Sequence, residues 1–130
     1  MSNKHNFTIK QGKTFERRIQ YQLNGEWFDL TDYEARMQIR PQYNSATVYC
    51  SLSSSIGIDG TGLNLTPVSG SVVLPRSSGS IGITISAHSS SQFTWKEAFF
   101  DLEIYSGSGV TQYVREILRG NIQVLPEVTK

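Results

Sequence analysis

The stretch Phe100-Asp101-Leu102-Glu103-Ile104-Tyr105 decides the fold, because its apolar and polar residues alternate strictly. A period of two places successive side chains on opposite faces of a β-strand, so one face is buried and the other meets water. A Ser/Gly turn at residues 106–109 joins this stretch to a second alternating segment over residues 110–124. We therefore expect a long hairpin, with a β-bulge at Gly120 in its second arm.

The same alternation recurs toward the N-terminus, where it predicts strands over residues 7–9, 14–23, 34–40 and 81–85. Asn24-Gly25 predicts a type I′ hairpin turn, because both residues accept a positive φ. Residues 41–80 predict short strands separated by exposed loops rich in Ser and Gly, and residues 87–92 a helical turn. About seven to nine short strands without a long helix favour an all-β fold, an antiparallel immunoglobulin-like β-sandwich.

Length and composition set the outer limits of this interpretation. A chain of 130 residues has room for one domain, which we place over residues 1–130, with a short polar N-terminal tail (1–6) and variable Ser/Gly-rich loops within 41–80. The formal net charge is +1 and the charges are dispersed, so we expect no nucleic-acid partner. No apolar run approaches the ~20 residues needed to cross a bilayer, so we expect no membrane partner. The single cysteine, Cys50, excludes an intramolecular disulfide.

Candidate catalytic and metal residues each have a simpler interpretation. Asp101 and Glu103 share a strand face, as acid/base pairs do, but that face is expected to be the solvated one. His5 and His88 lack a second ligand at metal spacing and are expected to be exposed. Asp59-Gly60-Thr61-Gly62 resembles a calcium turn only faintly and favours a plain turn. The sequence therefore predicts a protein that is not an enzyme and uses no cofactor or metal.

The aromatic residues leave two interpretations open. Trp27, Phe28 and Tyr33 cluster near the Asn24-Gly25 hairpin, and Trp95 precedes the strand at residue 98. Flat rings stack well on sugars, so these four residues are candidates for a carbohydrate-binding platform. Alternatively, the rings fill a thin core and seal its ends.

Four pieces in this order carry a resemblance to a known family. They are Gln11-Gly12-x-Thr14-Phe15, Asp29-Leu30-Thr31-Asp32-Tyr33-x-Ala35-Arg36-Met37-Gln38-Ile39-Arg40, Phe100-Asp101-Leu102-Glu103-Ile104 and Gly120-Asn121-Ile122-Gln123-Val124-Leu125-Pro126-Glu127-Val128-Thr129, where x is any residue. The chain resembles small virion proteins of tailed bacteriophages, in which such a β-sandwich also forms the N-terminal domain of baseplate upper proteins. Residues 41–80 depart from that pattern, and the chain stops at Lys130 where a baseplate upper protein continues.

The resemblance implies a structural component of the tail, baseplate or neck, acting as an adaptor or decoration protein through protein–protein contacts. It implies several symmetric copies bound to other virion proteins, on a particle assembled in the host cytoplasm. The family carries no catalytic motif, so none is transferred. The alternative expectation is a carbohydrate-binding module that contacts the host surface.

Overall fold

The structure is a computed structural model that describes residues 3–126, and within them it is all-β with one short α-helix. The predicted all-β class is confirmed. In chain order the elements are β1 (Asn3–Lys10), β2 (Phe15–Gln20), β3 (Gln22–Leu23), β4 (Glu26–Trp27), β5 (Glu34–Arg40), β6 (Cys50–Ser53), β7 (Gly62–Asn64), β8 (Val68–Ser69), β9 (Val72–Val73), η1 (Arg76–Ser78), β10 (Ser80–Ile85), α1 (Ala87–Ser91), β11 (Glu97–Ser106), η2 (Gly109–Thr111) and β12 (Tyr113–Leu125).

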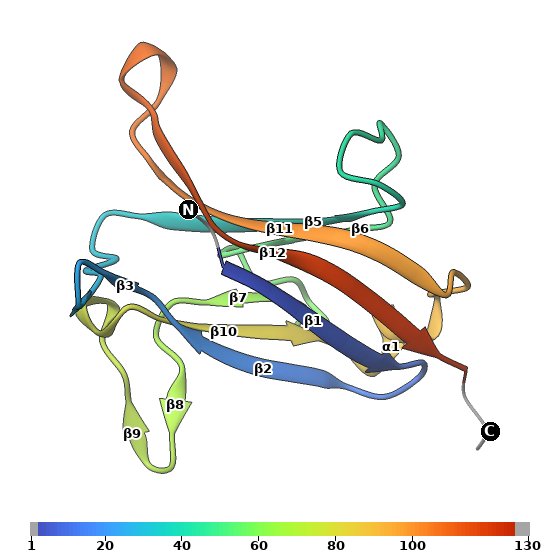
Figure 1. Cartoon of the computed structure of the whole chain (residues 1–130). Helices are drawn as coiled ribbons and strands as arrows, with labels where there is room; N and C mark the ends of the chain where they lie inside the picture. The colour runs from blue at the N-terminus through green and yellow to red at the C-terminus, as the bar shows by residue number, and fades with distance from the viewer. Residues whose placement is uncertain (1–2, 127–130) are drawn as a thin grey trace.

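Five strands form the larger sheet in the order β1-β12-β11-β5-β6 (Figure 1). Neighbouring strands in this sheet are antiparallel, except that β1 runs parallel to β12 with Phe7 opposite Ile122. The prediction of a wholly antiparallel sheet is therefore wrong at β1. These two strands lie at opposite ends of the sequence, so no turn fixes their relative direction. The predicted polar tail is also wrong for residues 3–6, which belong to β1, whereas residues 1–2 lie outside the described residues.

The smaller sheet has three antiparallel strands in the order β2-β10-β7, and β3–β4 and β8–β9 are two separate hairpins. Residues 3–126 thus hold twelve strands, more than the predicted seven to nine. Eight of them form the two sheets, and the other four are two-residue strands. Alternation cannot predict these four strands, because a strand of two residues is too short to show a repeating pattern.

The inward faces of both sheets supply one core, as the alternation predicts. Ala98, Phe100, Leu102 and Ile104 on β11 are buried, and so are the isoleucines at 81, 83 and 85 on β10. Phe7 on β1 stacks on Phe100 with ring centroids 5.0 Å apart. Fully burying a side chain of this size contributes roughly 1.5–3 kcal/mol, so the alternating strands provide most of the stabilising contacts.

The long β11–β12 hairpin is confirmed, but its bulge lies elsewhere than predicted. The register shifts between Leu102, which faces Leu118, and Glu103, which faces Glu116. Ile117 is therefore the extra residue. The consecutive residues Ile117 and Leu118 are both buried, as a bulge permits and regular alternation does not.

Gly120 is required by close packing. A Cβ atom at this position would lie 1.5 Å from the carbonyl oxygen of His5 in β1. No side chain fits there, so β1 can pair with β12 only because residue 120 is glycine.

The predicted turn at Asn24-Gly25 is confirmed by φ angles of 55° and 82°. These values suit a type I′ turn, whose twist matches that of the flanking strands. The predicted strand over residues 14–23 is divided at Tyr21, whose backbone hydrogen-bonds to Gly79 and Phe28 instead of continuing the ladder of β2. The turn therefore joins the two-residue strands β3 and β4.

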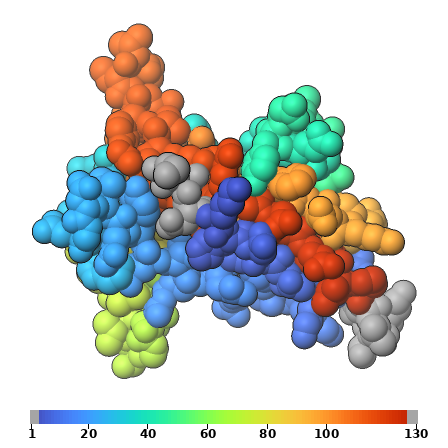
Figure 2. Space-filling view, viewed as in Figure 1, coloured from blue at the N-terminus to red at the C-terminus, as the bar shows by residue number. Residues whose placement is uncertain are grey.

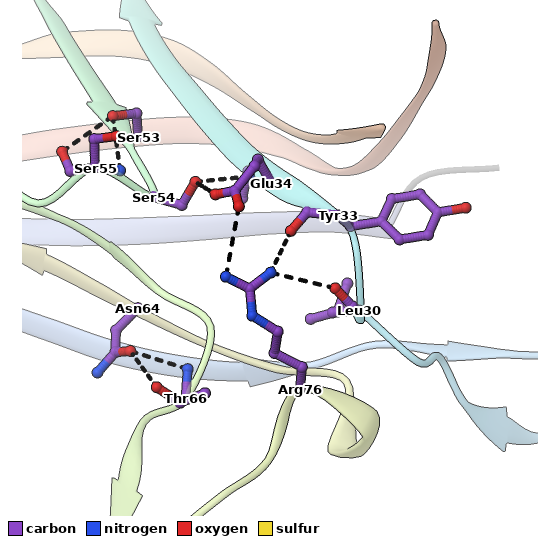
Figure 3. A network of polar contacts seen from close by, with 10 residues as sticks. Leu30, Tyr33, Glu34, Ser53, Ser54, Ser55, Asn64, Thr66 and Arg76 are labelled. Carbon is purple, nitrogen blue, oxygen red and sulfur yellow. Dashed lines mark hydrogen bonds and ion pairs between the residues drawn. The ribbon is translucent and has the colours of Figure 1, made fainter. Parts of the chain in front are cut away.

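An arginine connects the chain before β10 to the start of β5 (Figure 3). Arg76 donates from Nη1 to the carbonyl oxygen of Tyr33 at 2.5 Å, and its Nη2 lies 3.5 Å from Oε1 of Glu34. Glu34 also accepts a hydrogen bond from the Ser54 hydroxyl, which itself accepts from the Ala35 amide at 3.2 Å. This network ties the segments that follow β6 and precede β10 to the larger sheet.

Three segments project from the two sheets. Residues 106–112 and the segment between β5 and β6 rise on one side with a hollow between them, and β8–β9 extends on the other side (Figure 2). Among the described residues, α1 spans five residues, and no helix has the length and hydropathy needed to cross a bilayer.

Candidate functional site

The four aromatic residues singled out from the sequence do not form one platform. Phe28 and Tyr33 lie near Glu34, which pairs with Tyr105 toward the end of β11. Trp95 lies at the other end, just before β11 begins. A strand rises about 3.3 Å per residue, so the ten residues of β11 separate the two groups by roughly 30 Å.

At the first end the rings form a row of four. The centroids of Tyr21 and Phe28 are 5.4 Å apart, those of Phe28 and Tyr33 5.3 Å, and those of Tyr33 and Tyr113 6.0 Å. Tyr21 is buried, and Phe28 and Tyr33 are half-buried against the core. Tyr21, Phe28 and Tyr33 seal the end of the core, whereas Tyr113 and the neighbouring Trp27 are exposed, at 40% and 51%.

At the second end Trp95 stacks on Tyr49, with ring centroids 5.0 Å apart and planes 7° from parallel. Phe93 supports the indole from the core side at 4.9 Å. The pair borders a surface hollow of about 400 Å³ that His88 and Gln92 also line. Tyr49 was not among the aromatic candidates chosen from the sequence, because it lies outside any alternating run, in the segment that leads into β6.

Cys50 lines the same hollow but is not set up as a nucleophile. Burial, with a smaller effect of the Asp59 charge, raises the pKa of the Cys50 thiol above its ordinary value. The reactive form of cysteine is the thiolate, so a raised pKa keeps this thiol protonated and inert at neutral pH. His88 is exposed, as predicted, and so is His5.

Asp59 holds a loop in place by accepting several hydrogen bonds. Its carboxylate accepts from the hydroxyls of Ser86 and Ser89 at 2.6 Å each and from the backbone amide of Thr61 at 3.1 Å. These donors hold the pKa of Asp59 well below its ordinary value, the Ser86 hydroxyl most strongly. The two serine contacts bind this loop to α1 and its N-cap, and the Thr61 contact closes the loop itself, so the faint calcium signature corresponds to a hydrogen-bonded turn.

The outer face of the larger sheet carries the densest group of charges. Arg36 contacts Glu103 at 2.8 Å, and Arg119 contacts Glu116 at 3.2 Å. Tyr43, from the segment after β5, lies over this face, where the Arg119 guanidinium is 4.5 Å from its ring centroid. Two arginines, Arg36 and Arg40, and two carboxylates, Asp101 and Glu103, line a hollow of about 440 Å³ in this face, so the hollow has no strong preference for an anion or a cation.

Asp101 and Glu103 share this outer face, as the alternation predicts, but both are half-buried rather than freely solvated. Burial, then the charges of Glu103 and Glu116, raise the pKa of Asp101 above its ordinary value. Glu103 is held by Arg36, so the two carboxylates do not have the free geometry of an acid/base pair.

Within the part of the chain that the structure describes, no three His, Cys, Asp or Glu residues gather closely enough to hold a metal ion. The prominent exposed side chains are apolar instead. Val68 and Val73 face each other across β8–β9 at 59% and 61% exposed, and Val72 is 59% exposed. The short strands predicted within residues 41–80 include this arm, but nothing in the sequence indicated that it projects from the sheets.

No family model matches the chain, and no curated protein is significantly similar to it.

Proposed function

We propose that the protein is a structural component of a tailed phage particle, an adaptor or decoration protein that acts through protein–protein contacts. The observation that carries this proposal is the β8–β9 arm. Its three valines, at positions 68, 72 and 73, are each about 60% exposed. An isolated two-stranded hairpin is marginally stable in water, and exposed apolar groups of this kind are typical of surfaces that a neighbour covers.

The proposed architecture is an immunoglobulin-like sandwich, and the strand order supports it. The series β12-β11-β5-β6 corresponds to the strands of one immunoglobulin sheet, and β2-β10-β7 corresponds to strands of the other. A sandwich of this kind presents loops and edges for contacts while its core stays closed. That arrangement suits an assembly part present in several symmetric copies.

The test is the protein composition of purified virions. We expect mass spectrometry to detect the chain in intact particles, and a cryo-EM map to place it in the tail, baseplate or neck. Its absence from purified virions would overturn the proposal.

A pair of variants connects the proposal to the arm. Val68→Glu with Val73→Lys leaves the core untouched and places opposite charges across the hairpin, so the protein should fold while its incorporation into particles falls. Val114→Lys, at a valine 41% exposed on β12, is the matched control and should be incorporated normally. Equal incorporation of both variants would remove the arm from the proposal.

A second candidate function is binding of a host carbohydrate, which the Tyr49–Trp95 stack favours. Its parallel rings border a hollow with the polar side chains of His88, Ser89 and Gln92, the combination of flat and polar groups that sugars require. On a glycan array we expect Trp95→Ala to abolish repeatable binding and Trp27→Ala, at the far end, to retain it. Absence of any glycan signal would discard this candidate.

A further inference from the structure

One edge of the larger sheet is long and open. The strand order places β1 at the edge, and within residues 3–126 no strand pairs with its outer side. β1 has eight residues, of which Phe7 and Ile9 face the core while Lys4, Asn6, Thr8 and Lys10 are exposed. An edge of this length offers a row of backbone donors and acceptors to a further strand.

This edge, together with the turn and the strand β2 that follow it, is also the most basic part of the chain. Residues 3–20 contain five cationic residues and one acidic residue, although the whole chain has a formal net charge of only +1. The cationic residues, all of them exposed, are Lys4, Lys10, Lys13, Arg17 and Arg18. None of them takes part in the three ion pairs found among the described residues. The edge therefore attracts acidic groups.

Arg17 is exposed, but it lies against two aromatic rings at this side of the core. It occupies a core-facing position of β2, and its guanidinium lies 5.2 Å from the ring centroid of Phe7 and 5.6 Å from that of Phe15. Lysines on an edge strand and inward-pointing charges are both devices that prevent a sheet from pairing with its own copies. Two β1 strands side by side would also bring lysines together, and like charges across a strand pair repel.

We propose that β1 accepts an extended, acidic segment of another protein of the particle as a sixth strand of the larger sheet. Strand addition supplies affinity through main-chain hydrogen bonds, and side chains at alternate positions supply selectivity. Carboxylates on the added strand would face Lys4 and Lys10. The partner class rests on the proposed function, whereas the basic edge is a property of this chain alone.

A protein strand fits this surface better than a nucleic acid does. The outer face beside the edge pairs its arginines with carboxylates, Arg36 with Glu103 and Arg119 with Glu116, so it does not extend the basic surface that a phosphate backbone needs. A strand confined to the edge does not need such an extension.

The experiment uses the full chain and three synthetic eight-residue peptides that alternate Glu with Thr, Val or Tyr. We expect at least one peptide to bind, and amide hydrogen exchange followed by NMR to become slower in residues 3–10. The same peptides with Lys in place of Glu should not bind. Lys4→Glu with Lys10→Glu should weaken binding about tenfold or more, because two attractive pairs become repulsive. Lys96→Glu, at an exposed lysine before β11, is the matched control and should change the affinity less than about twofold.

Three results would overturn the inference. The first is that no acidic peptide binds at about 1 mM, which is the weak end of specific affinities. The second is slower hydrogen exchange that appears outside β1 instead of in it. The third is tighter binding of single-stranded oligothymidine than of the peptides. Each would leave the virion composition unchanged, so failure of this inference is distinguishable from failure of the proposed function.

Discussion

The two edges of the larger sheet, β1 and β6, are built in opposite ways. β1 has eight residues and exposed lysines, and its only strand partner among the described residues is β12. β6 has four residues and no charged side chain, and the chain just beyond it is held at Ser54 by Glu34 and the Ala35 amide. One edge is short, uncharged and braced against its neighbour β5 by side-chain hydrogen bonds, whereas the other is long and is kept from self-pairing by charge.

The largest expected effect comes from removing β1 from its sheet. In Gly120→Ala the new methyl group would overlap the His5 carbonyl, so β1 must leave β12 and expose Phe7 and Ile9. We expect the free energy of unfolding in urea to fall by about 3 kcal/mol or more, the sum for two buried side chains. Hydrogen exchange in residues 3–10 should accelerate.

The control is Gly57→Ala in the loop after β6, where a Cβ would lie 3.3 Å from a carboxylate oxygen of Asp59. That contact requires the Asp59 carboxylate to move by only a few tenths of an ångström, which its hydrogen bonds can follow, so we expect a change below about 1 kcal/mol. Equal losses in the two variants would contradict the assignment of Gly120 to strand packing.

A smaller loss is expected when the network beside β6 is opened. Arg76→Met keeps the apolar stem but leaves the carbonyl oxygen of Tyr33 without its charged donor and Glu34 without its ion pair. Hydrogen bonds to charged groups contribute about 1.5–3 kcal/mol, so we expect a loss of about 2 kcal/mol in urea unfolding. Arg18→Met, on the exposed face of β2, is the control; a loss as large there would show that the effect is not specific to the network.

A direct comparison of the edges uses two small substitutions. Ser54→Ala removes the acceptor of the Ala35 amide and should cost about 1 kcal/mol. Lys10→Ala, on the open edge, should stay within about 0.5 kcal/mol of the unmodified protein. The reverse order in thermal unfolding would mean that the side-chain hydrogen bonds beside β6 contribute less than the exposed lysine of β1.

The smallest expected change is in pH dependence on the β6 side. The pKa of Asp59 is lowered in the folded state, so its contribution is present above the ordinary aspartate pKa and is lost as the pH falls through the lower folded value. The melting temperature of Asp59→Asn should therefore be below that of the unmodified protein at neutral pH and approach it in acid.

Asp101→Asn is the control, and its effect on stability at neutral pH should have the opposite sign. Its raised pKa means that ionised Asp101 opposes folding, and this penalty grows as the pH rises through the folded pKa. Asp101→Asn should thus gain stability at neutral pH, and the gain should vanish in acid. A gain for Asp59→Asn at neutral pH would show that its hydrogen bonds do not stabilise the loop.

The fold could be predicted well wherever a strand is long enough to show its period. The β11–β12 hairpin, β5, β10 and the Asn24-Gly25 turn were all predicted from local residues, because alternation and turn chemistry act over a few positions. The parallel pairing of β1 and the bulge at Ile117 could not be predicted, because each depends on a partner strand distant in sequence or on packing across a pair.

The candidate surfaces were predictable to a smaller extent. Trp27 and Trp95 were noted as aromatic residues, but their separation along β11 and the stacking of Tyr49 depend on how the ends of the sheets meet. The lysines of β1 were visible in the sequence, yet nothing local indicated that they line an edge.

The sequence by itself determined which residues form strands and which faces of those strands are buried, because side-chain alternation is a property of neighbouring residues. The tertiary structure alone decided which strand lies at each edge, where the valine arm projects and which charges stay without an ion pair. These features arise from contacts between segments far apart in the chain, and such contacts leave no periodic trace in the order of the amino acids.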